Sequence, residues 1–310
     1  MRVAVLPTGK MEWHALPQAF RTLFPNHDFY SLPTQREVDE FGEEFPCCSF
    51  TSCDVTTLVS ENNADKLLER AAAAAIGNGK MQPPADLVLM LDDLELQNSD
   101  QPAAVVQVMR EAALRFLAKK QGPGRTRFET VLKKRVSFHL AKPMIESWLL
   151  ADPTALKTAG LPQSRLPSLP ASLDPECFDI QDSTYLSDDG SSCSSWQALQ
   201  ITRKKKDHMP LWLKKGSPRQ LHPKHYLSWL WKDPTNKSCS AYDETSTGVA
   251  ALKAFNWAAL LGKNSQHARF ARALIADVAL ALSEPNPFQG GTAAETFPVP
   301  SSPELVLRNL

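Results

Sequence analysis

The chain has 310 residues, of which 43% are hydrophobic and 22% are charged, a length that fits about two domains of ~150 residues or one elaborated α/β domain. This composition is typical of a folded protein and excludes a wholly disordered, collagen-like or coiled-coil chain. Because 34 acidic residues balance 34 basic ones, no net charge draws the whole molecule to nucleic acid or to an anionic membrane, and any such binding must be local.

Strand and helix patterns alternate along the first half of the chain. In chain order, we expect a strand at 3–6, a helix at 11–23, a strand at 45–51, a helix at 64–76, a strand at 86–91, a helix at 101–119, a strand at 135–140 and a short helix at 144–150. The strand at 86–91 is continuously apolar, which is typical of a strand buried on both faces of a parallel sheet. The alternation predicts a doubly wound α/β core over residues 1–160, with a mainly parallel sheet flanked by helices.

The second half is less regular. Three regions are expected there: an acidic, Pro- and Ser-rich insertion or linker at 161–202, a basic and aromatic segment with C-terminal helices at 203–282, and a flexible tail that frays or wraps a surface at 283–310. No basic residue lies between Arg165 and Arg203, whereas basic residues crowd the stretch that follows. Helical patterns return at 248–261 and 265–282.

Neither a membrane span nor a secretory signal is evident. The longest apolar runs fall far short of the roughly 18 to 20 residues that cross a bilayer. The amino terminus leads straight into the strand at 3–6, without an apolar region and a cleavage site. The six cysteines are sparse and irregularly spaced, which favours reduced thiols. We therefore expect a cytoplasmic protein with no membrane partner.

Acidic residues gather where predicted strands end. Asp92, Asp93 and Glu95 directly follow the strand at 86–91, and Glu12 lies one turn into the helix after the first strand. Open α/β sheets bind ligands at the carboxyl ends of their strands. Carboxylates that converge there repel one another unless a hard cation joins them, so the pattern indicates that Glu12, Asp92, Asp93 and Glu95 bind Mg²⁺ or Mn²⁺ for phosphodiester cleavage. The alternative is that these are ordinary solvated loop residues.

Several stretches together resemble the Toprim fold of topoisomerases, primases and the overcoming-lysogenization-defect nucleases. The chain is more closely similar to a bacterial Toprim-like family of unknown function, whose members occur near ATPase genes in phage-defence neighbourhoods. The stretches that carry the resemblance are 7–12, 87–95, 144–152 and 222–227, together with Tyr242, Gly248, Ala251, Leu252 and Trp257. The resemblance implies a Toprim-type core, a divalent metal, action on DNA or RNA, and an ATPase partner in phage defence.

The resemblance also bears on single residues. It adds Glu146 to Glu12, Asp93 and Glu95 as candidate catalytic residues, although a glutamate at a helix start also favours the helix dipole without any function. The Toprim pattern has a glutamate directly before the turn glycine, where this chain has Thr8. Thr8 therefore leaves open a catalytically inactive subunit that binds nucleic acid or scaffolds a complex. A further alternative is a phosphotransfer or nucleotide-processing enzyme that uses the same acidic cleft on a small substrate.

A basic segment rich in aromatic residues has the composition of a phosphate-binding surface. The candidate nucleic-acid-binding residues are Lys10, Arg203, Lys204, Lys205, Lys206, Lys214, Lys215 and Lys224. The alternative is a solvated loop, and a hypothesis that joins the two has the acidic stretch covering the basic one until nucleic acid displaces it. A homo-oligomer is compatible with the sequence. His139, inside an apolar strand, is expected to be a hydrogen-bonded core histidine rather than a base.

Overall fold

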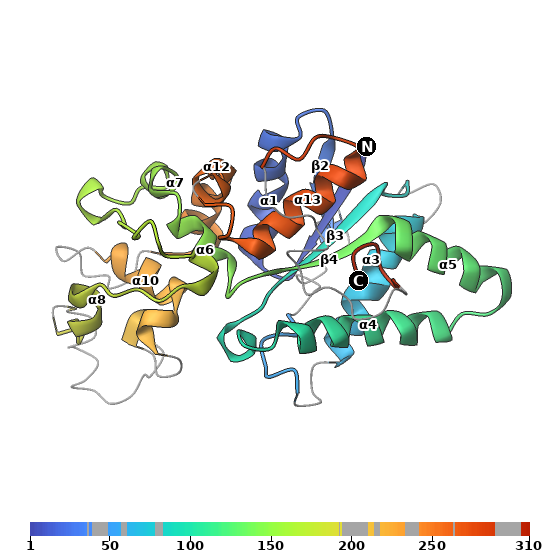
Figure 1. The fold of residues 1–310 in the computed structure, drawn as a ribbon, viewed down its shortest axis with the longest axis horizontal. Coiled ribbons are helices and arrows are strands. Elements are labelled where there is room, and N and C mark those ends of the chain that lie inside the picture. Colours follow the sequence, from blue (N-terminus) through green and yellow to red (C-terminus); the bar gives the residue numbers. More distant parts are fainter. Residues whose placement is uncertain are drawn as a thin grey trace.

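The computed structural model describes residues 1–35, 37–38, 49–56, 61–77, 83–191, 193, 210–213, 218–232, 242–262, 264–288 and 305–310. At the centre of these residues lies a four-stranded parallel sheet with the strand order β2-β1-β3-β4 (Figure 1). The strands are β1 (Arg2–Pro7), β2 (Asp28–Ser31), β3 (Leu87–Asp93) and β4 (Val136–Ala141). The expected α/β class and parallel sheet are confirmed.

Helices cover both faces of the sheet. The helices that follow the strands are α1 (Lys10–Leu23), α3 (Glu61–Ile76), α4 (Pro102–Ala118) and α5 (Gly122–Arg135), and α13 (Arg269–Leu282) joins them from the C-terminal part. In Figure 1, α1 and α13 lie over one face of the sheet, and α3, α4 and α5 lie over the other. This two-sided cover is what a doubly wound fold requires.

Alternate residues of the inner strands enter two separate cores. In β1, Val3 and Val5 join one hydrophobic cluster, while Ala4 and Leu6 join the other. Successive side chains of a strand point to opposite faces, so a strand between two helical layers must be apolar at every position. The continuous apolar character of β3 has the same cause, and the prediction that it is buried on both faces is confirmed.

The second strand differs from the expectation. The sequence pattern places it at 45–51, but β2 is Asp28–Ser31, and the described residues 49–51 form no strand. Residues 45–48 lie outside the described residues. Strand β2 has only four residues, lies at the sheet edge and buries only Phe29 completely, so it lacks the apolar run that marks the inner strands. Helix α5 was also not expected, because it opens with Gly-Pro-Gly and buries only Leu132.

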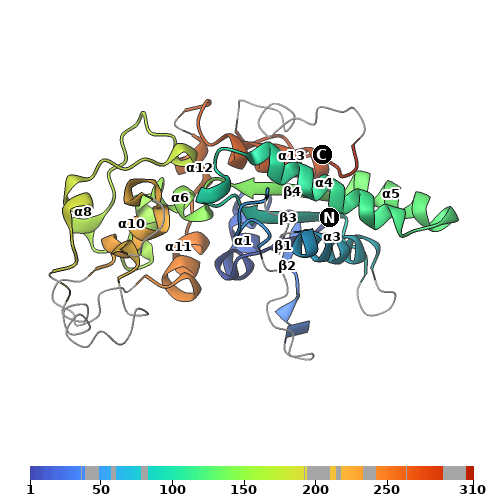
Figure 2. The same cartoon turned by 90° about the horizontal axis from the view of Figure 1, so that it is seen from below.

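The second half of the chain forms short helices at one end of the sheet, away from the turn between α4 and α5 (Figures 1 and 2). They are α6 (Ile145–Leu150), α7 (Pro153–Thr158), α8 (Ser183–Ser187), α10 (Pro223–Leu230), α11 (Val249–Lys253) and α12 (Trp257–Leu261). The expected helix at 248–261 is therefore two short helices, preceded by a turn of π-helix at Glu244–Gly248.

Acidic residues of the insertion hold this part together. Asp182 accepts hydrogen bonds from the backbone of Thr184 at 2.9 Å and from the hydroxyl of Tyr226 at 3.0 Å, which fastens α8 to α10. Glu176 is buried and accepts the backbone N–H groups of Phe270 and Ala271 at the start of α13. These two carboxylates are bound within the fold. Residues 203–209 and 214–217 of the basic segment lie outside the described residues, so a cover of that segment by the acidic stretch stays a prediction.

The end of the chain is packed rather than frayed. Leu307 and Leu310 are fully buried. The Asn309 side chain accepts a hydrogen bond from the Phe138 N–H and donates one to its carbonyl, which pairs the exposed edge of β4. Residues 305–310 therefore do not fray but pack against β4, in keeping with the alternative of a tail that wraps a surface. The preceding residues 289–304 lie outside the described residues.

Two further expectations bear on single side chains. His139 is fully buried and its Nε2 lies 3.2 Å from Oδ2 of Asp277, as expected for a core histidine. Cys53 and Cys177 are free thiols, but Cys193 is disulfide-bonded, so the expectation of reduced thiols fails there. Within the described part of the chain, no helix combines the length and the apolar character needed to cross a membrane.

Candidate active site

A pocket of about 320 Å³ opens where β1 and β3 end, and its wall is rich in carboxylates. Chain connections leave β1 and β3 toward opposite sides of the sheet, so this is the position at which open α/β sheets form ligand sites. Six carboxylates line the pocket, namely Glu12, Asp92, Asp93, Glu95, Glu146 and Glu244. The structure thus brings together all the acidic residues that the sequence analysis selected.

The Glu12 side chain can lie in the pocket because the residue before helix α1 is Gly9, which has no side chain to block it. Glu12 is the third residue of α1, is only 5% exposed, and belongs to the first helical turn. A Cβ atom at Gly9 would come within 2.6 Å of the Glu12 Cδ atom. Gly9 therefore leaves the space in which the Glu12 carboxylate lies.

Asp93 and Glu146 are joined through the start of α6. Oδ1 of Asp93 accepts a hydrogen bond from the backbone N–H of Ile145 at 3.0 Å, so the end of β3 holds the first turn of that helix. Glu146 is the next residue and is 4% exposed. The backbone N–H of Glu95 donates to the carbonyl of Pro143 at 2.7 Å, which fixes the segment after β3 against the same loop.

Asp92 faces a different set of partners. Its Oδ1 accepts a hydrogen bond from the Thr8 hydroxyl, and its Oδ2 accepts one from the backbone N–H of Phe50 at 3.3 Å. The side chain is 1% exposed. Both carboxylate oxygens thus bind protein donors, which sets Asp92 apart from the other carboxylates of the pocket.

The pocket holds more acidic than basic side chains, so its carboxylates repel one another. Burial, and then repulsion by Glu146, raise the pKa of Glu12 to about 8. The same two causes raise the pKa of Glu95 to about 7. Burial and repulsion by Glu12 hold the pKa of Asp93 well above its usual value. Closely spaced buried carboxylates resist ionisation in this way until a proton or a cation compensates them.

Helix α10 supplies the basic side of the pocket. Lys224 forms an ion pair with Glu244 and lowers the pKa values of both Glu12 and Glu95, although it does not cancel the effect of burial. The rings of His222 and His225 stack with centroids 3.6 Å apart and also line the pocket. Burial lowers the pKa of His222 to about 4, so this ring is neutral near pH 7.

Tyr242 borders the same site from the C-terminal part of the chain. Its hydroxyl donates a hydrogen bond to Sδ of Met11 at 3.7 Å. Burial, and then the charge of Glu146, hold its pKa well above the usual value. The sequence analysis proposed no role for His222, His225 or Tyr242, although all three lie in stretches that carried the family resemblance.

The donor atoms of the pocket suit a hard divalent cation in their chemistry, because Mg²⁺ and Mn²⁺ bind carboxylate oxygens. Their positions do not form a ready coordination shell. Among the described residues, no three His, Cys, Asp or Glu side chains are arranged to hold a metal ion. Glu12, Asp93, Glu95 and Glu146 are the residues that would hold a cation, and their side chains would have to turn toward one another to do so.

The candidate nucleic-acid residues divide into two groups. Lys224 lines the carboxylate pocket, and Lys10 is exposed at the start of α1. The other six candidates, Arg203, Lys204, Lys205, Lys206, Lys214 and Lys215, lie outside the described residues.

Comparison with protein-family models, with curated proteins and with solved structures finds no match to this chain. The fold class therefore rests on the sheet itself, and a Toprim-like identity remains an interpretation of the sequence.

Proposed function

We propose that this protein is a metal-dependent nuclease that cleaves phosphodiester bonds of DNA or RNA with Mg²⁺ or Mn²⁺. One observation carries the proposal: Glu12, Asp93, Glu95 and Glu146 line one pocket at the carboxyl ends of parallel strands. Burial and mutual repulsion raise the pKa values of Glu12, Asp93 and Glu95. A divalent cation would relieve this repulsion, as such cations do in carboxylate sites.

Each part of the pocket has a role in this proposal. A bound divalent cation supplies Lewis acidity and an activated water molecule. Glu12, Asp93, Glu95 and Glu146 would hold the cation. Asp92 instead fixes the end of β3 by accepting hydrogen bonds from Thr8 and Phe50. Lys224 lines the same pocket and carries the positive charge that attracts a substrate phosphate.

Cleavage of nucleic acids tests the proposal. Single- and double-stranded DNA and RNA would be incubated with Mn²⁺ and either the wild type or Asp93→Ala/Glu95→Ala. The control is Asp179→Ala/Glu111→Ala, which removes two exposed carboxylates outside the carboxylate pocket. We expect Mn²⁺-dependent cleavage by the wild type and by the control, and a loss of at least 100-fold in the pocket variant, a typical scale for groups that act directly in catalysis. Equal cleavage by all three proteins would reject the site.

The biological setting is part of the same proposal. The family resemblance suggests anti-phage defence together with an ATPase partner, so cleavage would be measured both alone and with an ATPase of the kind encoded beside members of that family. Activity that appears only with the ATPase would support this setting.

A second function is favoured by one specific contact. The Thr8 hydroxyl occupies Oδ1 of Asp92 at the place where the Toprim pattern has an acidic residue. This contact favours a catalytically inactive subunit that binds nucleic acid or scaffolds a defence complex. Absence of both Mn²⁺ binding and cleavage, with or without the ATPase, would support this second function.

A further inference from the structure

The hairpin of α4 and α5 carries a strong local positive charge. Residues 110–135 contain nine basic and two acidic residues, a difference of 9 − 2 = +7, whereas the whole chain has a formal net charge of +0. The basic residues are Arg110, Arg115, Lys119, Lys120, Arg125, Arg127, Lys133, Lys134 and Arg135, and the acidic ones are Glu111 and Glu129. A local charge of this size attracts polyanions even though the molecule as a whole is neutral.

Part of this charge has partners within the fold. Arg115 pairs with Asp65 of α3 at 2.8 Å, and Lys119 pairs with Glu69 at 3.3 Å. By contrast, Arg127 and Lys134 are exposed and form no hydrogen bond or ion pair with the described residues. The positive charges of Arg127 and Lys134 are therefore not neutralised by contacts with the described residues.

Two cations without a partner among the described residues, Arg127 and Lys134, lie on the same side of α5. Arg127 and Lys134 are seven residues apart, which is about two helical turns, so their side chains share one side of the helix about 10 Å apart. Arg125 and Lys133 are also exposed on this helix, although Lys133 pairs with Glu129 at 2.8 Å. A helix that presents spaced cations along its length matches a polymer of phosphates, in which charges also recur at regular distances.

The surface of α5 does not suit an apolar partner. Its apolar residues Phe128, Val131 and Leu132 pack inward against one of the two hydrophobic clusters. Its exposed residues are Gly, Pro, Thr, Arg and Lys. Binding to a membrane by an amphipathic helix needs exposed apolar residues, and protein interfaces concentrate their energy in buried aromatic and apolar anchors. Nucleic-acid backbones are bound through charge without such anchors.

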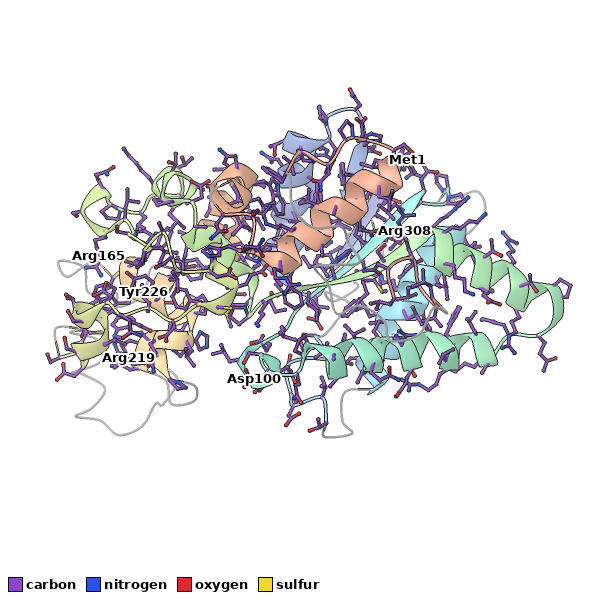
Figure 3. All side chains as sticks on the ribbon, in the orientation of Figure 1. Met1, Asp100, Arg165, Arg219, Tyr226 and Arg308 are labelled. Carbon is purple, nitrogen blue, oxygen red and sulfur yellow. The ribbon has the colours of Figure 1, made fainter. Side chains whose placement is uncertain are left out.

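The hairpin is also distant from the carboxylate pocket. Helix α4 begins just after the carboxylates that end β3 and runs for 17 residues, or about 25 Å, before the chain turns into α5. In Figures 1 and 2, the turn between α4 and α5 projects at one end of the molecule, and α10 lies at the other. Asp100, labelled in Figure 3, marks the end of α4 that is nearer the pocket.

We propose that the α4–α5 hairpin is a docking surface for the phosphate backbone of a nucleic acid, separate from the carboxylate pocket. The choice of nucleic acid as the polyanion rests on the proposed function, but docking itself does not require cleavage. A nucleic acid held at this surface would be retained near the protein by charge and would show no base specificity.

Binding measured without divalent cations tests the docking surface. The anisotropy of a fluorescein-labelled 30-base-pair DNA duplex would be titrated with the wild type, with Arg127→Ala/Lys134→Ala, and with Lys157→Ala/Lys253→Ala. The last variant removes two exposed lysines from α7 and α11 and so changes the net charge by the same amount. Circular dichroism would verify that all three proteins are folded.

We expect the hairpin variant to bind the duplex at least tenfold more weakly than the control variant. The slope of log affinity against log salt concentration should also fall by about two in magnitude, since each phosphate contact contributes about 0.9. Equal affinity of the two variants would overturn the docking surface. Vesicles of phosphatidylserine form a further arm, and loss of vesicle binding with unchanged DNA binding would overturn the choice of nucleic acid.

These outcomes are separate from those of the cleavage test. Weaker DNA binding by the hairpin variant, together with no cleavage by any variant, would support the docking surface and reject the nuclease. Metal-dependent cleavage together with equal DNA binding by the two variants would support the nuclease and reject the docking surface.

Discussion

The hydroxyl of Thr8 donates a hydrogen bond to Oδ1 of Asp92, and this contact joins the carboxyl ends of β1 and β3. Asp92 is almost completely buried, so its carboxylate depends on protein donors for its solvation. The bonds that it accepts lower its pKa, but burial outweighs them and raises the pKa to about 6. Thr8 thus stabilises the ionised form of Asp92 and does not itself act as an acid or base.

Replacement of Thr8 tests this contact. Thr8→Val keeps the shape of the side chain but removes the donor, so the free energy of unfolding near pH 7.5 should fall by about 1–3 kcal/mol, the cost of leaving a buried acceptor without its partner. Urea denaturation measures the change. Thr8→Ser, which keeps the hydroxyl, should be close to the wild type, and equal loss in both variants would show that the hydroxyl contributes nothing.

The raised pKa values predict how stability depends on pH. Glu12 has a usual pKa of 4.5 and a folded value of about 8, and Glu95 has a folded value of about 7. The unfolded chain loses these protons near pH 4.5 whereas the folded protein keeps them, so the free energy of unfolding should fall as pH rises from about 4.5 to 8.

Urea denaturation at pH 5 and at pH 8, without divalent cations, measures this dependence. Glu12→Gln should reduce the difference between the two pH values, because glutamine does not ionise. Glu111→Gln, at an exposed site on α4, should leave the difference as in the wild type. A wild type that is equally stable at both pH values, or a Glu12→Gln variant that keeps the full difference, would contradict the crowding of the carboxylates.

Gly9 offers a way to displace Glu12 without replacing it. In Gly9→Ala, the new Cβ would lie within 2.6 Å of the Glu12 Cδ atom, so the flexible glutamate would have to move away. We expect the fold to persist and the affinity for Mn²⁺ to fall by about tenfold, or ~1.4 kcal/mol. Calorimetric titration measures the affinity. Gly124→Ala is the matched control, because nothing lies within 4 Å of its Cβ position, and comparable losses in both variants would argue against the role of Gly9.

The packed C-terminus should contribute to the stability of the sheet. Truncation after residue 304 removes the buried Leu307 and Leu310 and exposes the edge of β4 that Asn309 pairs. The two leucine side chains alone are expected to contribute about 3–6 kcal/mol, measurable by urea denaturation. Leu305→Ala should have little effect because Leu305 is 37% exposed. A truncated chain as stable as the wild type would mean that these contacts are not maintained in solution.

Local patterns in the sequence were sufficient to predict the inner strands and the acidic residues at their ends. Strands β1 and β3 lie inside the sheet and are apolar over most of their length because helices cover both faces, and the carboxylates of β3 stand at its end. Strand β4 lies at an edge and includes Ser137 and His139, but all of its residues are buried. Strand β2 lies at the edge and α5 is almost wholly exposed, so neither has the apolar pattern that reveals an element. Edge strands and exposed helices are positioned by tertiary contacts rather than by their own patterns.

The histidines and the tyrosine beside the pocket were harder to predict for a different reason. His222 and His225 line the same pocket as Glu12, and Tyr242 bonds to Met11, although more than 200 positions of the chain separate them from Glu12 and Met11. One sequence gives no measure of such distant contacts. The structure of the acidic insertion depends on similar contacts. Asp182 accepts a hydrogen bond from Tyr226 of α10, and Glu176 accepts one from Phe270 of α13. Their acidic composition alone suggested a loop.

The most direct test of the central claim is a calorimetric titration of the protein with Mn²⁺ at pH 7, in two buffers of different ionisation enthalpy. If Glu12, Asp93, Glu95 and Glu146 together form one cation site, Mn²⁺ should bind and release protons, because the carboxylates with raised pKa values must ionise to bind it. Glu12→Gln/Glu95→Gln should abolish both the binding and the proton release. Absence of Mn²⁺ binding by the wild type, or binding that the double variant retains, would contradict the claim.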